Sequence, residues 1–370
     1  MEGYPKFFLE FGSMKLLLKT LQKNKYEVVG PTVRDKAIVY EFIDHFEDFP
    51  IGIYDDQNNG YYRIKKTNNG TIFSGYTVGQ NSVKQFIYPS VKTIFKFLKK
   101  NNNYRIDTQE NDIPELAFIG LRACELAAIK ILDKILIQGA YVDHDYLQFR
   151  QKMIVIAVNC SSPGNTCFCE SMNTGPVVSE GFDLALTEID NDSYFVVTVG
   201  SEKGHKLLQT LSLSTASDKQ LSDEKSTLEK AKSKMSRKLS LGFFGNSLNG
   251  QFDNPDWDEI AGRCLTCGNC TMVCPTCFCI NFEDETDIQG KTAVRLRKWD
   301  SCFNREFSNI HGGCIRQSGK SRYRQWLMHK LSYWNNQFDL SGCVGCGRCI
   351  TWCPVGIDIT EEATRICKNV

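Results

Sequence analysis

The hydrophobic pattern of the first 215 residues alternates between strand-like and helix-like segments. Two apolar runs, "LAFIGL" (116–121) and "MIVIAVNC" (153–160), are typical of strands buried on both faces. Between them, "CELAAIKILDKIL" (124–136) has the periodicity of an amphipathic helix. A strand, a helix and a strand in this order predict a right-handed βαβ unit, and therefore an α/β domain. The segment "FDLALTEIDNDSYFVVTVG" (182–200) predicts a hairpin that turns at Asp190-Asn191-Asp192.

Two charged segments predict helices on the surface. Near the N-terminus, apolar residues are interrupted by Glu10, Lys15 and Lys19 at a spacing that suits an amphipathic helix. Residues 217–240 are highly charged and helix-prone, which is typical of a solvated helix or a linker. We therefore expect an α/β domain over residues 1–215, a charged helical linker over 216–245 and a second domain over 246–370.

The composition is that of an ordinary globular chain except for its cysteines. Of 370 residues, 42% are hydrophobic and 24% charged, and the net charge of +1 indicates no partner of opposite sign. Seventeen cysteines stand against five histidines. Disulfide-dense chains are mostly small secreted domains, whereas this chain is long and begins without a signal-peptide pattern. No run of about twenty apolar residues predicts a membrane span. Thiolate–metal chemistry in a reducing cytoplasm fits best.

Two cysteine motifs of the same spacing lie beyond residue 263. The first is C-x2-C-x2-C-x3-C-P and comprises Cys264, Cys267, Cys270 and Cys274; the second repeats it 79 residues later with Cys343, Cys346, Cys349 and Cys353. This is the spacing of bacterial ferredoxins, in which three thiolates from one tight loop bind three irons of a cube. Gly268, Gly345 and Gly347 would let the backbone approach the sulfides. Two [4Fe–4S] clusters are predicted.

The pairing of the two motifs remains open at this stage. In two-cluster ferredoxins the fourth cysteine of each motif ligates the other cluster. This arrangement would join Cys353 to the first motif and Cys274 to the second, although an unswapped assignment is an alternative. Zinc is a further alternative, because two C-x2-C elements can form a four-thiolate site. Zinc, however, has no need of the third and fourth cysteines of each motif. We expect the domain that carries them to be mainly α-helical and ferredoxin-like.

Four earlier cysteines predict a third [4Fe–4S] centre. Cys124 follows the first predicted strand, Cys160 ends the second, and Cys167 and Cys169 lie on the following loop. Ligands of open α/β sheets bind at the carboxyl ends of the strands, so the four thiols should meet at one edge. The N-terminus of the helix should also lower the pKa of Cys124. The alternatives are a zinc site or buried thiols without a ligand.

Other motifs do not support a catalytic site of this chain. "GGCIRQSGKS" (312–321) is similar to a phosphate-binding loop, but Gly313 lies one residue too far from Gly319. No dinucleotide-binding fingerprint follows a strand. Residues 291–330 carry ten Lys and Arg against two Asp and Glu. Because this stretch lies between the two cluster motifs, we expect it to offset cluster charge or to contact an acidic partner, and no nucleic-acid binding is expected.

Several longer segments resemble one family. "GLRACELAAIKILDKIL", "VNCSSPGNTCFCESM", "RCLTCGNCTMVCPTCFC", "WDSCF" and "CVGCGRCITWCPVGIDI" are similar to the beta subunit of cytoplasmic [NiFe] hydrogenases (sulfhydrogenases), and to the related A subunit of anaerobic sulfite reductase. The resemblance implies an electron-carrying subunit that is not catalytic alone. It would act between a flavin subunit that handles NAD(P)H and the small and large subunits of the hydrogenase. The alternative is the electron-input subunit of a sulfite or polysulfide reductase.

Several cysteines of the second domain lie outside the two ferredoxin-type motifs. Cys277, Cys279 and Cys302 match positions where relatives also carry cysteine, and the spacing of Cys277 and Cys279 is that of Cys167 and Cys169. Together with Cys314 they could form a further metal site. Packing of the cluster loop against the N-terminal domain is the alternative that we favour.

Overall fold

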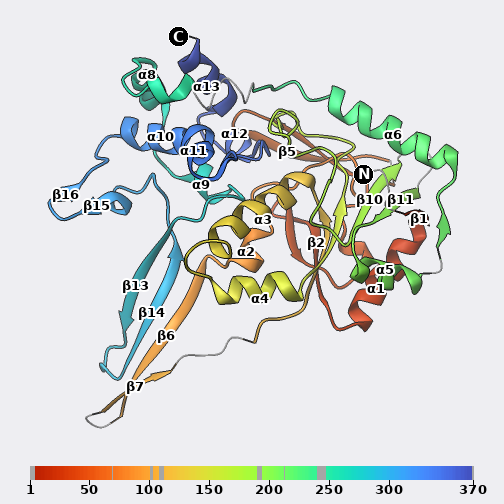
Figure 1. The fold of residues 1–370 in the computed structure, drawn as a ribbon, viewed down its shortest axis with the longest axis horizontal. Coiled ribbons are helices and arrows are strands. Elements are labelled where there is room, and N and C mark those ends of the chain that lie inside the picture. Colours follow the sequence, from red (N-terminus) through yellow and green to blue (C-terminus); the bar gives the residue numbers. More distant parts are fainter. Residues whose placement is uncertain are drawn as a thin grey trace.

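The computed structural model describes residues 5–68, 70–100, 103–107, 112–189, 194–211, 213–239 and 247–368. An eight-stranded mixed sheet forms the centre of the N-terminal part of the chain (Figure 1). Four adjacent strands, β10, β9, β8 and β2, run parallel, and the other pairs are antiparallel. In spatial order the strands are β12 (Ser214–Thr215), β1 (Lys6–Glu10), β11 (Tyr194–Val199), β10 (Leu184–Ile189), β9 (Ile154–Val158), β8 (Leu116–Leu121), β2 (Glu27–Arg34) and β3 (Ala37–Phe42).

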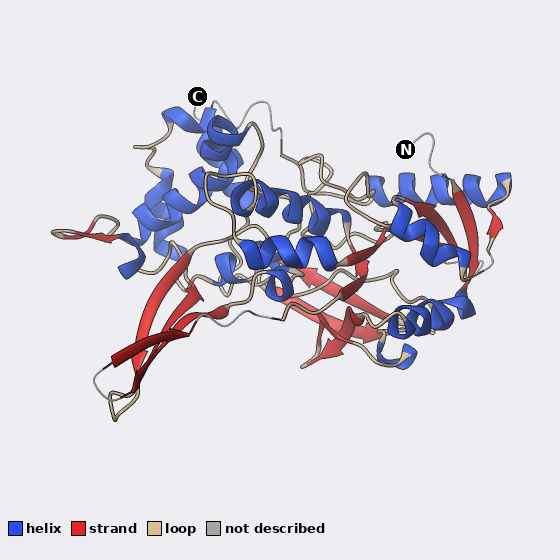
Figure 2. Cartoon of the chain, turned by 60° about the horizontal axis from the view of Figure 1, so that its bottom comes forward, coloured by secondary structure: helices blue, strands red, loops and turns tan. Residues whose placement is uncertain are grey.

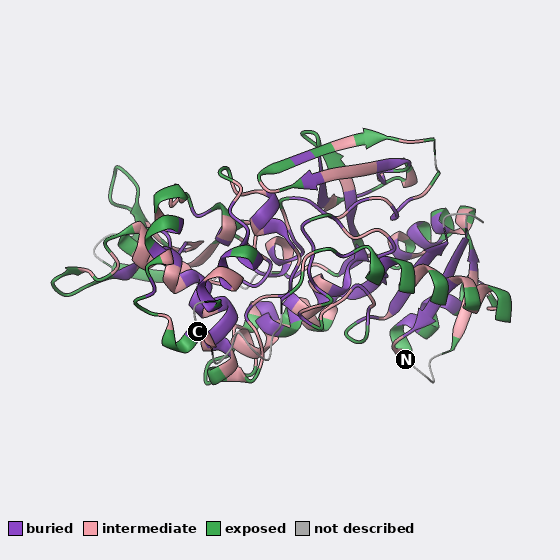
Figure 3. Cartoon of the chain, turned by 90° about the horizontal axis from the view of Figure 1, so that it is seen from above, coloured by how far each residue is buried: buried purple, intermediate pink, exposed green. Residues whose placement is uncertain are grey.

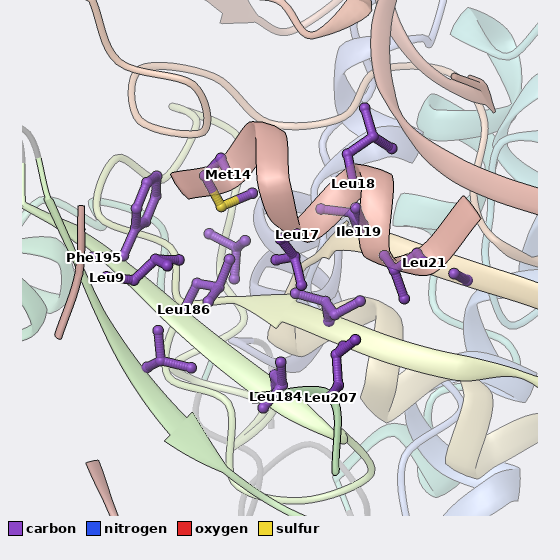
Figure 4. Packing of buried hydrophobic residues seen from close by; sticks show 14 of the residues in the cluster. Leu9, Met14, Leu17, Leu18, Leu21, Ile119, Leu184, Leu186, Phe195 and Leu207 are labelled. Atoms are coloured by element: carbon purple, nitrogen blue, oxygen red, sulfur yellow. The ribbon is translucent and has the colours of Figure 1, made fainter. Parts of the chain in front are cut away.

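Helices cover both faces of this sheet, because its inner strands carry apolar side chains on both sides. On one face, α1 (Met14–Lys23) and α5 (Glu202–Gln209) pack against a core that includes Ile119 and Leu186 (Figure 4). On the other face, neighbouring Phe118 packs with the helices of the second core cluster. These helices are α2 (Lys84–Ile87), α3 (Ala123–Leu136) and α4 (His144–Lys152). Figure 3 shows the buried residues gathered on the strands of the large sheet.

The predicted βαβ unit is present. The two expected strands are β8 and β9, which pair in parallel, and α3 connects them together with α4. The expected hairpin is formed by the antiparallel pair β10 and β11, whereas its predicted turn at residues 190–192 lies outside the described residues. The N-terminal amphipathic helix begins only at Met14, because residues 6–10 form the strand β1. An α/β N-terminal region is therefore confirmed.

A buried carboxylate connects the large sheet to the loop before residue 75. Glu188 on β10 is 2% exposed and accepts hydrogen bonds from the backbone N–H groups of Ile72 (2.6 Å), Phe73 (2.8 Å) and Ser74 (2.6 Å). Burial raises the pKa of this carboxyl, and the three N–H donors oppose the shift. The side chain thus satisfies three donors that would otherwise be buried without a partner.

Removal of this carboxylate should weaken the fold. We expect Glu188→Ala to lower the free energy of unfolding by roughly 3 kcal/mol, because it leaves buried N–H groups unsatisfied. Glu188→Gln is the matched control: it keeps the chain length and one acceptor oxygen, so its loss should be smaller. Urea unfolding followed by circular dichroism measures both. An alanine variant as stable as the wild type would contradict this role.

The charged helix predicted after residue 216 is present as α6 (Asp218–Ser233). It begins at Ser217, whose hydroxyl accepts from the backbone N–H of Gln220 in a capping box. Although most of the helix is solvated, Glu224 is buried: its carboxylate accepts from Lys6 Nζ at 2.6 Å and from Thr187 Oγ1 at 2.8 Å. One face of α6 is therefore attached to the large sheet, and the proposed domain boundaries stay a prediction.

A four-stranded sheet projects from the body of the molecule (Figure 2). Its order is β13 (Ile280–Thr286), β14 (Thr292–Trp299), β6 (Val91–Lys100) and β7 (Asn103–Asp107). Strand β14, which lies after the first cysteine motif, thus pairs with β6 of the N-terminal half. The expectation of a mainly helical second domain holds only in part, because the segment between the two motifs contributes strands to this sheet.

The rest of the C-terminal part is a cluster of short helices around its own apolar core, which contains Trp257, Leu327 and Ile366. The helices are α8 (Asp256–Arg263), α9 (Asn269–Met272), α10 (Gly319–Met328), α11 (Trp334–Phe338), α12 (Arg348–Thr351) and α13 (Ile359–Cys367). Two small hairpins, β4 (Ile53–Asn58) with β5 (Tyr61–Lys66) and β15 (Asn309–Ile310) with β16 (Gly313–Cys314), complete the described structure. No helix within the described residues is long and apolar enough to cross a membrane.

Candidate metal centres

The first cysteine motif wraps around the short helix α9. Cys264 ends α8, and left-handed backbone at Thr266 (φ 52°) and Gly268 (φ 76°) turns the chain so that Cys270 falls inside α9. The N–H of Thr266 donates to the Cys264 sulfur at 3.4 Å. Hydrogen bonds to sulfur are one of the ways in which proteins tune iron–sulfur clusters.

The structure brings Cys353 of the second motif to the first motif. One pocket is lined by Cys264, Cys267, Cys270 and Cys353, which we call the outer group. Phe303, Tyr323, Trp326 and Ile357 complete an apolar lining. This is the geometry expected for exchanged fourth ligands.

Cys274 of the first motif lies with the other three cysteines of the second. The strongest electrostatic neighbours of Cys349 are Cys343, Cys346 and Cys274. Cys343 and Cys346 also interact with Cys274. We call these four residues the central group. Because Cys346 also lines the pocket of the sheet-edge cysteines and Cys349 lines the outer pocket, the central group lies between the two.

The four early cysteines meet at the carboxyl ends of β8 and β9. Cys124, Cys160, Cys167 and Cys169 line one pocket, and we call them the sheet-edge group. All four thiols are free, and Cys167 Sγ lies 3.7 Å from the carbonyl oxygen of Cys346.

The expected lowering of the pKa of Cys124 is wrong. Burial raises the pKa of this thiol well above its ordinary value, the neighbouring Cys346 raises it further, and the Arg348 guanidinium only partly opposes the shift. Burial likewise raises the pKa values of Cys160 and Cys167. Loss of water is therefore the largest influence on this thiol. A ligand that binds thiolates would supply the missing stabilisation of the charged form.

The glycines of the second motif have a packing role that the sequence did not reveal. Gly345 has φ 63°, and a Cβ there would lie 2.7 Å from the backbone of Phe168. Gly347 has φ 76°, and its Cβ would lie 2.4 Å from the carbonyl oxygen of Thr166. The N–H of Phe168 also donates to the Gly345 carbonyl at 2.8 Å. These glycines allow the central loop to contact the loop of the sheet-edge group directly.

Two buried arginines at the sheet-edge group were not predicted. Arg122 donates to the carbonyls of Phe73 and Tyr76, and it lines the pocket. Arg348 pairs with Glu125 through Nη2 and Oε1 at 2.5 Å, with both side chains at most 5% exposed. Arg122 lies two residues before Cys124 and Arg348 directly before Cys349, but only the three-dimensional structure shows that both are buried.

Three of the remaining cysteines have a thiol partner, and their role as metal ligands stays a prediction. Cys277 is hydrogen-bonded to Cys274, and Cys279 to Cys302; the latter bond lowers the pKa of Cys279 to about 7. Cys314 lies elsewhere, with its sulfur 3.0 Å from the carbonyl oxygen of Arg305. Within the described ranges, no three His, Cys, Asp or Glu side chains are arranged to hold a single metal ion.

Two comparisons with known proteins identify the family. Residues 263–357 match the model of the 4Fe-4S dicluster domain, and so include both cysteine motifs. The chain is 31% identical over 294 residues to sulfhydrogenase 2 subunit beta of Pyrococcus furiosus, an alignment that covers 75% of this chain and 84% of that protein. The chain belongs to the sulfhydrogenase beta-subunit family. No solved structure matches it.

As a sulfhydrogenase beta-subunit homologue, the chain is an iron–sulfur subunit with a role in electron transfer. Its thiols fit this role, because [4Fe–4S] clusters are held by four cysteine thiolates and the outer and central groups each present four. The sheet-edge group offers the same donor set around a pocket of similar size. How many of the three groups hold a cluster stays a prediction.

Proposed function

We propose that this chain carries three [4Fe–4S] clusters, held by the outer, central and sheet-edge groups, and relays electrons inside a hydrogenase complex. Its partners would be a flavin subunit that handles NAD(P)H and the small subunit of a [NiFe] hydrogenase, beside the large subunit. The observation that carries this proposal is the arrangement of twelve thiols in three neighbouring groups of four, with the central group in contact with both others. When bound, such clusters supply one-electron chemistry.

The surface near the outer group supports partner docking at that end. Cys267 is exposed, and Leu265 (60% exposed) and Val355 (39%) line the same pocket while presenting apolar side chains to solvent. Met272, which follows in α9, is 38% exposed. Exposed apolar side chains around a redox group are typical of a surface that another protein covers. We therefore propose that electrons enter or leave the chain here.

The buried surroundings of the other two groups support a protected path. Cys160, Cys167 and Cys169 are buried, and their loop is tied to the central loop through Thr166. Thr166 Oγ1 lies 2.7 Å from Thr351 Oγ1 on α12, and both hydroxyls lie within 3.1 Å of Gln57 Oε1. This hydrogen-bond network connects the loop of the sheet-edge group to α12 of the second motif and to Gln57 on β4. A cytoplasmic location stays a prediction.

Reduction of the isolated chain tests the proposal. We expect the anaerobically purified chain to accept electrons from a strong chemical reductant, with the appearance of EPR signals of reduced clusters. When H2 or NAD(P)H is the only electron donor, the isolated chain should not reduce dyes. The reason is that we assign its cysteines to electron transfer and find no nickel or flavin motif in the sequence. Hydrogen-dependent dye reduction by the single chain would contradict the proposal.

Purification with native partners tests the choice of complex. We expect an affinity-tagged chain expressed in its own host to retain a nickel-containing subunit and a flavin. Retention of a siroheme-containing subunit instead would identify the sulfite-reductase alternative. The matched control is the same tag on a chain with Leu265→Glu and Val355→Glu, which should lose one partner while it keeps its iron.

A further inference from the structure

Two lysines are buried beside the loop that follows the first cysteine motif. Lys330 is 4% exposed and Lys84 is 2% exposed. Lys330 belongs to a π-helical segment, His329–Tyr333, that interrupts the helix between α10 and α11. Such π-helical turns are rare and are often found at functional sites.

The Lys330 ammonium group faces the central group. Its Nζ donates to Thr276 Oγ1 at 2.6 Å and to the Gly342 carbonyl at 3.2 Å. Thr276 Oγ1 in turn lies 3.2 Å from Cys274 Sγ. The strongest electrostatic partners of the ammonium group are the thiols of Cys274, Cys277 and Cys343. Lys330 is therefore linked to Cys274 through the Thr276 hydroxyl, and its charge acts on two of the four sulfurs of the central group.

Lys84 approaches the same loop from the N-terminal half of the chain. Its Nζ donates to the backbone carbonyls of Cys274 (3.0 Å) and Cys277 (2.8 Å) and lies 3.9 Å from the centre of the Trp299 ring. Both ammonium groups interact electrostatically with the thiols of Cys274 and Cys277, but only Lys330 also interacts with Cys343. The two lysines thus differ in how directly their charges act on the central group.

These two buried cations have no carboxylate partner in the described part of the chain. Arg348 and Lys6, by contrast, both pair with buried glutamates. A buried charge costs several kcal/mol unless it is paired. The thiols that face Lys330 are those of Cys274 and Cys343 in the central group and of Cys277 beside it, so thiolates and the cluster that they bind would supply the counter-charge. Such a cluster is anionic and gains one negative charge when it is reduced.

We propose that Lys330 is the counter-charge of the central group and raises the reduction potential of the cluster held there. This inference rests on the proposed function and goes beyond it by assigning a role to a residue that is no ligand. Reduction adds one electron; no bond forms or breaks, and Lys330 keeps its proton. A fixed cation close to two ligand sulfurs favours the more negative, reduced state.

The proposal is tested by redox titration of full-length variants followed by EPR. Lys330→Met should shift the midpoint potential of the central cluster to lower values and leave the other two unchanged. The central signal is identified as the one that changes in Cys349→Ser. Lys330→Arg, which keeps the charge, should retain a potential close to that of the wild type. Lys84→Met should produce a smaller shift, because Lys84 interacts with one ligand sulfur of the central group, that of Cys274, whereas Lys330 interacts with those of Cys274 and Cys343.

Each outcome of these titrations either supports or contradicts the counter-charge role of Lys330. An unchanged central potential in Lys330→Met with full iron content would overturn the proposal, and so would equal shifts in the Met and Arg variants. If Lys330→Met does not fold, Lys330→Gln removes the charge but keeps a donor for Thr276. Loss of iron from the central group in the Met and Gln variants, but not in the Arg variant, supports the counter-charge role. A wild-type chain without reducible clusters would instead refute the proposed function.

Discussion

Replacement of Cys160 by alanine is expected to lower the iron content from about twelve to about eight atoms per chain. The reason is that Cys160 lines the sheet-edge pocket together with Cys124, Cys167 and Cys169, and a cubane cluster needs four protein ligands in this setting. The outer and central groups share no cysteine with this pocket except Cys346, which borders it, so their clusters should remain. Iron and protein analysis of anaerobically purified chains measures the change.

A matched control distinguishes loss of a ligand from loss of a thiol. Cys314→Ala removes a cysteine whose sulfur contacts Arg305 and Ser308 and no predicted ligand, so it should keep the iron content of the wild type. A wild-type chain with about eight iron atoms would show that the sheet-edge group holds no [4Fe–4S] cluster. Its four thiols would then be buried cysteines that happen to border one pocket.

Replacement of Arg348 by methionine is expected to destabilise the chain by about 3–5 kcal/mol. The substitution leaves the Glu125 carboxylate, which is fully buried, without its guanidinium partner. It also removes the hydrogen bond from Arg348 Nε to the Gly79 carbonyl (3.0 Å), one of the contacts between the second cysteine motif and the N-terminal half. Urea unfolding of the holoprotein, followed by circular dichroism, measures the loss.

The double variant Arg348→Met with Glu125→Gln tests whether the unpaired charge is responsible. Removal of both charges should restore part of the lost stability, because an uncharged amide costs less to bury than a carboxylate. The Glu125→Gln variant alone is the second reference for this cycle. Equal stability of the single Arg348→Met variant and the double variant would show that packing, rather than charge, dominates the effect.

The ferredoxin motifs could be predicted because their geometry is local. Three thiols that bind one cube must come from a single tight loop, so the spacing of Cys264, Cys267 and Cys270 carries the information by itself. The sheet-edge group required one further step. Parallel strands end at the same edge of a sheet, so Cys124 and Cys160 could be expected to lie close once a βαβ unit was predicted. Both predictions rest on short-range patterns combined with a general rule of topology.

Features that depend on long-range packing could not be predicted in this way. The pairing of β14 with β6 joins segments almost 200 residues apart, and no periodicity in either segment indicates a partner. The direction of the Cys124 pKa shift could not be predicted for a related reason. A helix N-terminus is visible in the sequence, whereas the degree of burial that outweighs its dipole is not.

The sequence by itself determined the chemistry of this protein: which thiols are available, how they are spaced, and that an α/β region precedes two cluster motifs. Only the tertiary structure decided which thiols share a pocket, that the central group lies between the other two, and that Lys330 and Lys84 are buried beside it. The physical reason is that ligand spacing is encoded over a few residues, whereas burial and the neighbours of a charge arise when distant segments pack together.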